Sequence, residues 1–319
     1  MNNEPNDSIL SRPLFIVGPL RSGTTLLRLI LDHHPQVNIF GEFEFSVSQA
    51  IGEKWPSIPD YKNFFKNDRA ALQFGLELND QLGYEDIQKD FLRQLHSRKP
   101  REIIGASIHS RIDLLPKLWP RARYINLYRD PRDVARSCIG MGWVGNVYYG
   151  SDYWIKTEER REYLFKCVKP ENMIGIHYED LVRSPRENIA KICGFIGIPY
   201  REEMLDIERG SSYKAPDPRF AEQWRLKLSD RDINYVENRC AERMQRQGYQ
   251  LSQSNLLPPN LWIRWYLALQ NRIYRAHFHI RRWGITLWFA KKIANWTRSY
   301  QLQSWAAIRI NKIDSRYLK

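Results

Sequence analysis

The chain has 319 residues, of which 43% are hydrophobic and 13% aromatic, and its formal net charge is +13. This length supplies a sizeable core, so stabilisation by disulfides or structural metals is not required. The four cysteines follow neither a CxxC nor a zinc-binding spacing, which predicts reduced thiols in a cytoplasmic protein without a metal site. The sequence has no run of 18 apolar residues, so no membrane span is predicted. The polar start of the chain does not have the pattern of a signal peptide.

Apolar strands alternate with helical segments along most of the chain. Strands are predicted at residues 14–18, 103–108, 122–128 and 172–178. Helices are predicted at about 24–32, 114–119, from about 131, 186–196 and 229–247, and residues 44–99 read as mostly helical and irregular. This alternation predicts an α/β protein of the three-layer, P-loop-NTPase-like type with a central parallel sheet. Ligands then bind at the carboxyl ends of the strands.

The positive charge is concentrated in the last part of the chain. Residues 255–319 contain twelve Lys and Arg residues, six of the eleven tryptophans and one acidic residue, Asp314. The 37 basic and 35 acidic residues before them give residues 1–254 a net charge of only +2. We therefore expect a flexible N-terminus at 1–12, a main domain at 13–254 and a basic helical tail at 255–319.

The segment Pro13 to Thr25, PLFIVGPLRSGTT, joins an apolar strand to a loop bounded by two glycines. Gly18 and Gly23 have the spacing of a phosphate-binding P-loop, but Thr24 stands where ATP- and GTP-hydrolysing loops carry a lysine. Backbone N–H groups at a helix N-terminus can still cradle a phosphate. The loop therefore predicts binding of a nucleotide-like phosphate in a protein that is not an ordinary NTPase. The alternative is a plain strand–turn–helix corner.

Further motifs follow this loop in a fixed order: FGE at 40–42, YINLYRDPRDVARS at 124–137, HYEDLVRSP at 177–185, FIGIPY at 195–200 and WRLKLSD at 224–230. Together they resemble sulfotransferases that use 3′-phosphoadenosine 5′-phosphosulfate (PAPS), over roughly residues 12–249. The RSGTT loop is most similar to the bacterial and tyrosylprotein branch. The resemblance implies sulfuryl transfer from PAPS to a hydroxyl or amine acceptor. PAPS has no γ-phosphate and no metal requirement, which explains a loop without lysine.

The resemblance also implies where the donor binds. The 5′-phosphosulfate would be held by Arg21, Ser22, Gly23, Thr24 and Thr25. Of these, Arg21 and the threonine hydroxyls would neutralise charge that builds on the leaving phosphate, so Arg21 also counts as catalytic.

A second group of residues matches the nucleotide end of the donor. Arg129 and Ser137, eight residues apart, match the clamp on the 3′-phosphate, since a guanidinium fork suits a phosphate dianion. Arg132 is a further candidate for the clamp. The alternative for Arg129 is a surface ion pair with Asp130.

Three more residues are candidates for the adenine end and the closing loop. Tyr178 resembles the position near the adenine, with a packed strand-end tyrosine as the alternative. Lys214 and Arg225 occupy the stretch where the family closes a loop over the nucleotide. Each is either a phosphate contact or a solvated surface charge.

Sulfuryl transfer needs a group that accepts the proton of the attacking hydroxyl. Glu42 is the first choice, because it follows the P-loop helix where this branch carries its glutamate base. Glu44 and His109 are the alternates. An exposed loop glutamate and a hydrogen-bonded strand-end histidine are the corresponding structural interpretations.

One position departs from the family. Relatives often carry a lysine near the transferred group where this chain has Ser107. His109, Arg111 or Arg21 would then have to supply the charge. The departure leaves the acceptor class open.

The tail has an amphipathic helical pattern and resembles no family. One face consists of Trp262, Tyr266, Leu269, Ile273, Ala276 and Ile280, and the other of Arg264, Ala268, Asn271, Arg275, His279 and Arg282. One hypothesis is a helix in an anionic membrane interface, which makes the enzyme peripheral to the membrane. The other is a helix docked on its own domain or on a second subunit in a homodimer. Nucleic-acid binding is not favoured, because no recognised module accompanies the tail.

The sequence thus predicts a PAPS-dependent sulfotransferase acting on a hydroxyl acceptor, with a lipid or glycan as one hypothesis for the acceptor. Two other classes stay open. The first is a P-loop kinase or NTPase, which would require ATP and Mg²⁺. The second is a non-catalytic, nucleotide-gated membrane-binding protein.

Overall fold

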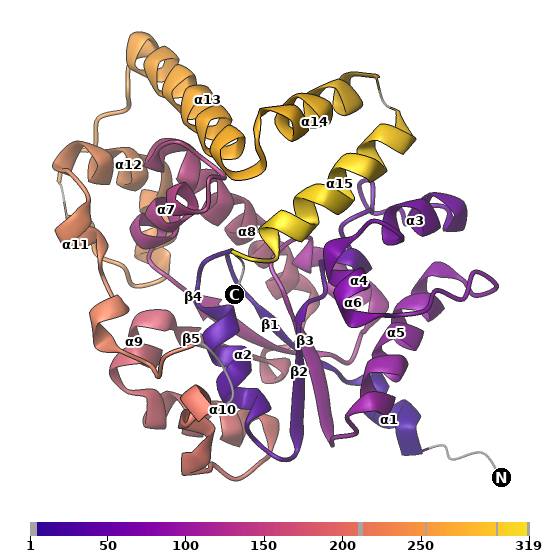
Figure 1. Ribbon diagram of the computed structural model, residues 1–319. Helices are drawn as coiled ribbons and strands as arrows, with labels where there is room; N and C mark the ends of the chain where they lie inside the picture. Colours follow the sequence, from indigo (N-terminus) through magenta and orange to yellow (C-terminus); the bar gives the residue numbers. More distant parts are fainter. Residues whose placement is uncertain (1–4, 210–212, 253, 298, 318–319) are drawn as a thin grey trace.

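The computed structural model describes residues 5–209, 213–252, 254–297 and 299–317 (Figure 1). The strands are β1 (Leu14–Val17), β2 (Val37–Glu42), β3 (Ile103–Ile108), β4 (Arg123–Tyr128) and β5 (Met173–His177). The helices of the first half are α1 (Pro5–Ser11), α2 (Thr24–Asp32), α3 (Ile58–Phe65), α4 (Arg69–Phe74), α5 (Tyr84–Arg98), α6 (Leu115–Leu118), α7 (Pro131–Gly140) and α8 (Val147–Cys167). Those of the second half are α9 (Tyr178–Arg183), α10 (Pro185–Ile196), α11 (Trp224–Lys227), α12 (Asp230–Arg246), α13 (Leu261–Trp283), α14 (Ile285–Thr297) and α15 (Tyr300–Asp314).

The five strands form one parallel sheet in the order β2-β3-β1-β4-β5. From β1 the chain crosses to β2 at one edge, and from β4 it continues to β5 at the other edge. The carboxyl ends of β1 and β4 therefore flank the point where the direction of winding reverses, which is where doubly wound sheets bind ligands. The predicted α/β fold with a central parallel sheet is confirmed.

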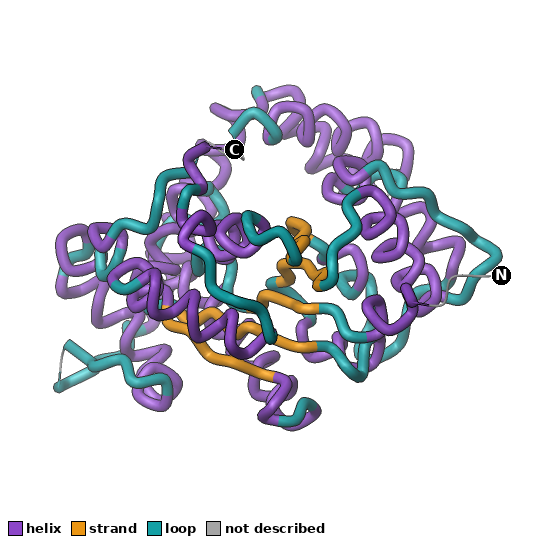
Figure 2. The backbone as a smooth tube through the Cα atoms, turned by 90° about the horizontal axis from the view of Figure 1, so that it is seen from below, coloured by secondary structure: helices purple, strands orange, loops and turns teal. Residues whose placement is uncertain are grey.

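The sheet lies between two layers of helices, as Figure 2 shows. Leu14 and Ile16 of β1 pack into a core with residues of α2, α9 and α10. Phe15 and Val17 point to the opposite face, into an aromatic-rich core with residues of α5 and α6. All four side chains are fully buried, so β1 is the central strand of a three-layer structure.

The structure corrects two expectations for the first part of the chain. The sequence prediction omits β2, an edge strand whose Val37 and Ile39 are buried beside β3 and whose other residues give a weak alternation. The expectation of a flexible N-terminus at 1–12 does not hold for α1, because Leu10 is buried in the aromatic-rich core. Residues 1–4 lie outside the described part of the chain.

The tail folds into α13, α14 and α15, which lie along the top of Figure 1. α13 docks on the loop between α7 and α8: Asn271 Oδ1 accepts a hydrogen bond from Gly145 N at 2.7 Å, and Leu267 O accepts one from Asn146 Nδ2 at 2.9 Å. A Cβ on Gly145 would lie 2.8 Å from the Asn271 Cα, so this close approach requires glycine. α15 contacts the other side of the domain, where Ser304 Oγ donates to Asn67 Oδ1 at 2.6 Å.

The docked face of α13 is the face that carries Asn271, while the tryptophan-rich face points outward. Trp262 is 84% exposed and Trp265 is 75% exposed. The tail is thus anchored on its own domain and still displays its apolar face. Among the described residues, no helix combines the length and hydropathy needed to cross a bilayer.

Candidate active site

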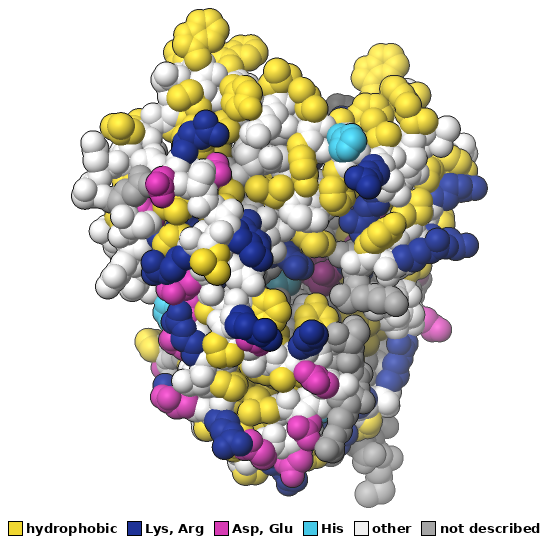
Figure 3. Space-filling view, turned by 60° about the vertical axis from the view of Figure 1, so that its left-hand side comes forward, with side chains coloured by type: hydrophobic (Ala, Val, Ile, Leu, Met, Phe, Trp, Pro, Cys, Tyr) yellow, Lys and Arg dark blue, Asp and Glu magenta, His cyan; other side chains and the backbone are white. Residues whose placement is uncertain are grey.

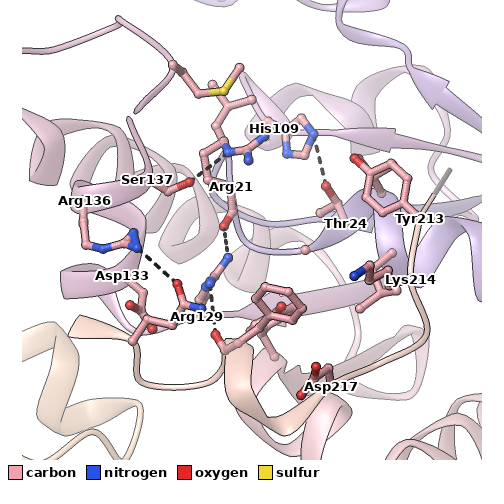
Figure 4. Close-up of a pocket in the computed structure, with 18 of the residues that line it drawn as sticks. Arg21, Thr24, His109, Arg129, Asp133, Arg136, Ser137, Tyr213, Lys214 and Asp217 are labelled. Carbon is pink, nitrogen blue, oxygen red and sulfur yellow. Dashed lines mark hydrogen bonds between the residues drawn. The ribbon is translucent and has the colours of Figure 1, made fainter. Parts of the chain in front are cut away.

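A cavity of about 520 Å³ opens at the carboxyl ends of β1 and β4 (Figure 4). Its walls come from the loop after β1, from α7 and from segments around residues 178 and 213–223. The cations that line it are Arg21, Arg129, Arg136 and Lys214. The carboxylates that line it are Glu42, Asp133 and Asp217. Its volume suits a small-molecule ligand.

The glycine loop has the backbone needed to face an anion. Gly23 has φ of 92° and precedes α2, and no side chain caps the helix. A Cβ at Gly23 would lie 2.4 Å from the Tyr178 ring, so glycine is required both by the left-handed backbone and by this contact. Thr24 and Thr25 line the cavity at the start of α2, and the N–H groups of a helix N-terminus are suited to binding an anion.

The structure brings Arg21 of the glycine loop together with Arg129 and Ser137, which lie more than 100 residues later in the chain. Arg21 Nε donates to Ser137 Oγ at 3.0 Å, and Arg129 Nη1 donates to the backbone oxygen of Arg21 at 2.6 Å. The Arg129 guanidinium lies over the Tyr178 ring, 4.2 Å from its centroid. Its Nε is buried and makes no hydrogen bond among the described residues. The predicted clamp and the predicted loop therefore form one site.

His109 closes the back of the cavity. Its Nδ1 lies 3.1 Å from the Gly18 carbonyl oxygen and its Nε2 lies 3.4 Å from Thr24 Oγ1. Because a carbonyl can only accept, Nδ1 carries the proton and Nε2 accepts from the threonine hydroxyl. In this tautomer the lone pair of Nε2 accepts the Thr24 hydrogen bond. His109 thus orients Thr24.

The two candidate bases have different environments. Glu42 lines the cavity, is half-exposed and forms an ion pair with Arg69 of α4. Glu44 does not line the cavity. Its Oε1 accepts from the backbone N–H of His109 at 2.8 Å, and burial raises its carboxyl pKa, as does the nearby Glu42 carboxylate. The geometry favours Glu42 as the group that meets a substrate and Glu44 as a support for His109.

Several residues lie away from where the sequence suggests. Arg225 is outside the cavity lining and pairs with Glu222 at 3.2 Å. Arg132 is buried in ion pairs with Asp130 and Glu237 at 2.6 and 2.5 Å, so it does not join the clamp. Ser22 belongs to the glycine loop, but it is fully buried and does not line the cavity.

The departure from the family at Ser107 is not compensated by Arg111. The Arg111 guanidinium donates to the backbone oxygens of Ala50 and Gly52, and Arg111 does not line the cavity. Ser107 Oγ is buried and makes no hydrogen bond among the described residues. Arg21 is the predicted substitute that lies in the cavity as a cation.

The sequence reasoning misses two charged residues of α7. Arg136 lines the cavity and donates to Gln223 Oε1 at 3.1 Å. Asp133 accepts from the backbone N–H of Trp224 at 2.8 Å, and burial raises its carboxyl pKa to about 6. Both lie within the motif that contains Arg129 and Ser137. Their spacing of three residues puts them on one face of α7, a signal that could have identified them.

A parallel sheet with a glycine loop after its central strand and a cation-lined cavity at the strand ends defines a phosphate-binding α/β protein of the P-loop-like class. The model of the sulfotransferase family matches residues 13–202. This is more than half of the chain, so the protein belongs to the sulfotransferase family and is an enzyme of that class.

Individual relatives agree with this assignment. A putative protein-tyrosine sulfotransferase of Caenorhabditis briggsae is 28% identical over 202 residues, covering 60% of this chain and 68% of that protein. Protein-tyrosine sulfotransferase 1 of Danio rerio is 25% identical over 207 residues, covering 61% of this chain and 56% of that protein. The match to the family model does not extend into the tail.

Solved structures show the same fold. The sulfotransferase domain of the Synechococcus PCC 7002 olefin synthase superposes with a TM-score of 0.53 at 22% identity, over 72% of this chain and 95% of that one. The sulfotransferase domain from the curacin biosynthetic pathway gives a TM-score of 0.51 at 20% identity, over 75% and 98%. These structures agree in fold, and the match to the family model confirms the resemblance stated from the motifs.

A buried carboxyl behind the site predicts how stability depends on pH. Glu179 accepts from the backbone N–H of Asp130 at 3.1 Å and from Tyr249 OH at 3.0 Å, and burial raises its pKa to about 7. Between about pH 4.5 and 7 the folded protein therefore binds more protons than the unfolded chain, so this carboxyl stabilises the fold less as pH rises. We expect Glu179→Gln to gain roughly 1–3 kcal/mol relative to the wild type between pH 4.5 and 8.

The measurement is the free energy of unfolding in guanidinium chloride across that pH range. Glu203→Gln, which removes an exposed carboxyl, is the matched control. A difference between wild type and Glu179→Gln that is the same at pH 4.5 and 8 would contradict the assignment.

Proposed function

We propose that the protein transfers a sulfuryl group from PAPS to a hydroxyl of an acceptor, with the donor held in the 520 Å³ cavity. The observation that carries this proposal is the convergence of Arg21, Arg129 and Ser137 at the end of a glycine loop without a P-loop lysine. Two phosphate-binding centres in one cavity suit a donor with phosphates at both its 3′ and 5′ positions.

The residues present fit this donor electrostatically. The Arg129 guanidinium donates to the carbonyls of Arg21 and Phe220 at 2.6 and 3.4 Å, and no ion pair with a carboxylate engages it in the described structure. Its charge is therefore available to a phosphate dianion, for which a guanidinium fork is well suited. Arg136 and Lys214 add positive charge to the same cavity.

PAPS supplies the sulfuryl group in this reaction. Arg21, the N–H groups at the start of α2 and the Thr25 hydroxyl stabilise negative charge on the leaving 5′-phosphate, whereas the single proton of the Thr24 hydroxyl is donated to His109. As the acceptor oxygen bonds to sulfur and the bond from sulfur to the phosphate oxygen breaks, Glu42 takes the acceptor proton. Arg69 fixes the direction of that carboxylate. The products are the sulfated acceptor and 3′,5′-adenosine bisphosphate.

The donor site predicts selective ligand binding. We expect 3′,5′-adenosine bisphosphate at 100 times its Kd to stabilise the wild type by about 2.7 kcal/mol, and ATP with Mg²⁺ to stabilise it far less. Arg129→Ala should lose most of this effect, since it removes the fork. Thermal unfolding with each ligand tests both statements.

The matched control is Arg225→Ala, which removes an exposed arginine outside the cavity and should respond as the wild type does. Equal stabilisation of the Arg129→Ala protein by 3′,5′-adenosine bisphosphate would remove the clamp assignment. Preferential stabilisation by ATP with Mg²⁺ would favour the kinase or NTPase alternative.

The base assignment predicts a difference between two neighbouring glutamates. We expect Glu42→Gln to slow sulfate transfer from labelled PAPS by about 100-fold or more while 3′,5′-adenosine bisphosphate still binds. Glu44→Gln, which keeps an oxygen for the His109 N–H, should retain most of the activity. Transfer at the wild-type rate by Glu42→Gln, with a loss in Glu44→Gln, would reverse the two roles.

We further propose that the acceptor is a hydroxyl of a lipid or lipid-linked glycan, reached at an anionic membrane surface. Hydrophobic side chains gather along the upper edge of Figure 3, over α13 and α14. Those more than about half exposed are Leu261, Trp262, Trp265, Tyr266, Leu269, Ile273, Ile285, Phe289 and Trp296. Such a patch on a monomer marks an interaction surface, and interfacial helices combine tryptophans with basic residues.

Charge favours a lipid surface over another protein as the occupant. The acidic residue of the tail, Asp314, points inward to Arg282 and Trp283 and is not part of the exposed patch. Arg264 and Arg281 of α13, the helix that carries much of the patch, are exposed, and neither forms an ion pair among the described residues. A surface of this kind is complementary to anionic headgroups.

Membrane binding is tested by cosedimentation with vesicles of phosphatidylglycerol and phosphatidylcholine. We expect the double variant Trp262→Ala, Trp265→Ala to bind at least tenfold more weakly than the wild type, because it removes two exposed indoles from the patch. The control removes two exposed apolar residues elsewhere, Tyr163→Ala and Leu226→Ala. Equal binding by both double variants, or self-association without vesicle binding, would contradict the proposal.

A further inference from the structure

A second cavity, of about 290 Å³, lies between the tail and the main domain. It is lined by Met141, Trp143, Tyr153, Arg275, Phe278, His279, Arg282, Trp283, Lys291 and Asp314. Met141 and Trp143 also line the donor cavity, so the two spaces share a wall. Most of the remaining lining comes from α13, α14 and α15, beyond the segment 13–202 that matches the family. This cavity is therefore a feature of the tail.

The second cavity carries more positive than negative charge. Three cations line it, Arg275, Arg282 and Lys291, against the single carboxylate of Asp314. Arg282 Nε lies 2.8 Å from Asp314 Oδ1, and Trp283 Nε1 donates to the same oxygen at 3.0 Å. Among the described residues, neither Arg275 nor Lys291 forms an ion pair. Two cations at the second cavity are thus without a carboxylate ion-pair partner among the described residues.

The titration of neighbouring groups agrees with this excess of charge. Burial, together with the positive charges of Lys291 and Arg275, lowers the pKa of His279 to about 4. Burial also lowers the pKa of Lys291; the nearby Asp314 carboxylate opposes this shift, and Arg275 adds to it. His279, stacked on Trp283 with ring centroids 4.1 Å apart, is consequently neutral near pH 7 and adds no further repulsion.

We propose that the second cavity binds the phosphate group of the acceptor and so directs the acceptor hydroxyl past Met141 and Trp143 into the donor cavity. This inference rests on the proposed sulfotransferase function. Guanidinium and ammonium groups from different helices bind the several oxygens of a phosphate, and the negative charge of a bound phosphate monoester or diester offsets the repulsion between Arg275 and Lys291. The volume accommodates a phosphate ester with a few attached carbons.

The position of the second cavity indicates that its ligand is the acceptor and not the donor. A phosphate bound there lies on the far side of the wall formed by Met141 and Trp143 from the donor. The outer faces of the same helices carry the apolar patch proposed to contact the membrane. A phosphate-bearing headgroup is thus one source of the ligand, and a soluble phosphate ester is the other.

The experiment measures binding by calorimetry with the donor cavity saturated by 3′,5′-adenosine bisphosphate. The probes are monomeric dihexanoyl phosphatidylglycerol, glycerol 3-phosphate and uncharged glycerol. The test variant is Arg275→Ala, Lys291→Ala. Its matched control is Arg272→Ala, Lys292→Ala, which removes the same charge from the same two helices at positions outside the cavity lining.

We expect the test variant to bind the phosphate probes at least tenfold more weakly than the wild type and the control variant to bind them as the wild type does. Loss for both phosphate probes indicates a soluble ester, and loss for the lipid alone indicates a headgroup. Equal affinities of the test and control variants, or binding of glycerol as tight as that of the phosphates, would overturn the proposal.

Thermal stabilisation by 3′,5′-adenosine bisphosphate separates the two levels of inference. If this nucleotide stabilises the wild type and the test variant alike while phosphate affinities do not differ, the second site fails and the donor site stands. If it does not stabilise the wild type, the proposed function fails instead.

Discussion

The organisation of the site depends on the contacts that the Arg129 guanidinium makes. This arginine follows β4, donates to the backbone of the glycine loop after β1 and packs on the Tyr178 ring that begins α9. Three segments that converge only through the order of the strands are therefore tied together by one side chain. Since Gly23 packs on the same ring, the loop and the arginine are positioned by a common support.

Behind this contact lies a layer of buried ionisable groups. Asp130 caps α7 by accepting from the Arg132 backbone N–H at 2.9 Å, and the Arg132 guanidinium pairs with Asp130 and Glu237. Removing charges from water costs free energy, and such networks add specificity more reliably than stability. Here they fix the turn at residues 129–130, from which Arg129 reaches the loop. Asp130, Arg132 and Glu237 thus help to position Arg129, although none of the three lines the cavity.

The motifs predict much of the cavity lining, because many of its residues lie in short, contiguous segments of the sequence. The glycine loop, Arg21, Arg129 and Ser137 lie in short segments whose residue types are set by phosphate binding. The failures have physical causes: β2 has only a weak alternation, and Arg132 pairs with Glu237, a partner 105 residues away that spacing cannot reveal. Arg225 pairs locally with Glu222, three residues before it. The direction in which the tail helix faces was also beyond the sequence, because it depends on the Asn271 contact with Gly145. An amphipathic pattern specifies two faces but does not say which one is buried.

The inward-pointing Asp314 has a consequence for the order of events during synthesis. It contacts Trp283, 31 residues earlier in the chain, and it lies well beyond the segment shared with the family. Because proteins emerge from the ribosome amino end first, the sheet and its arginine can assemble before α15 exists. In a nascent chain the donor cavity can therefore form first, and the second cavity is completed only when Asp314 reaches Trp283. The cavity proposed to bind the acceptor therefore forms after the cavity proposed to bind the donor.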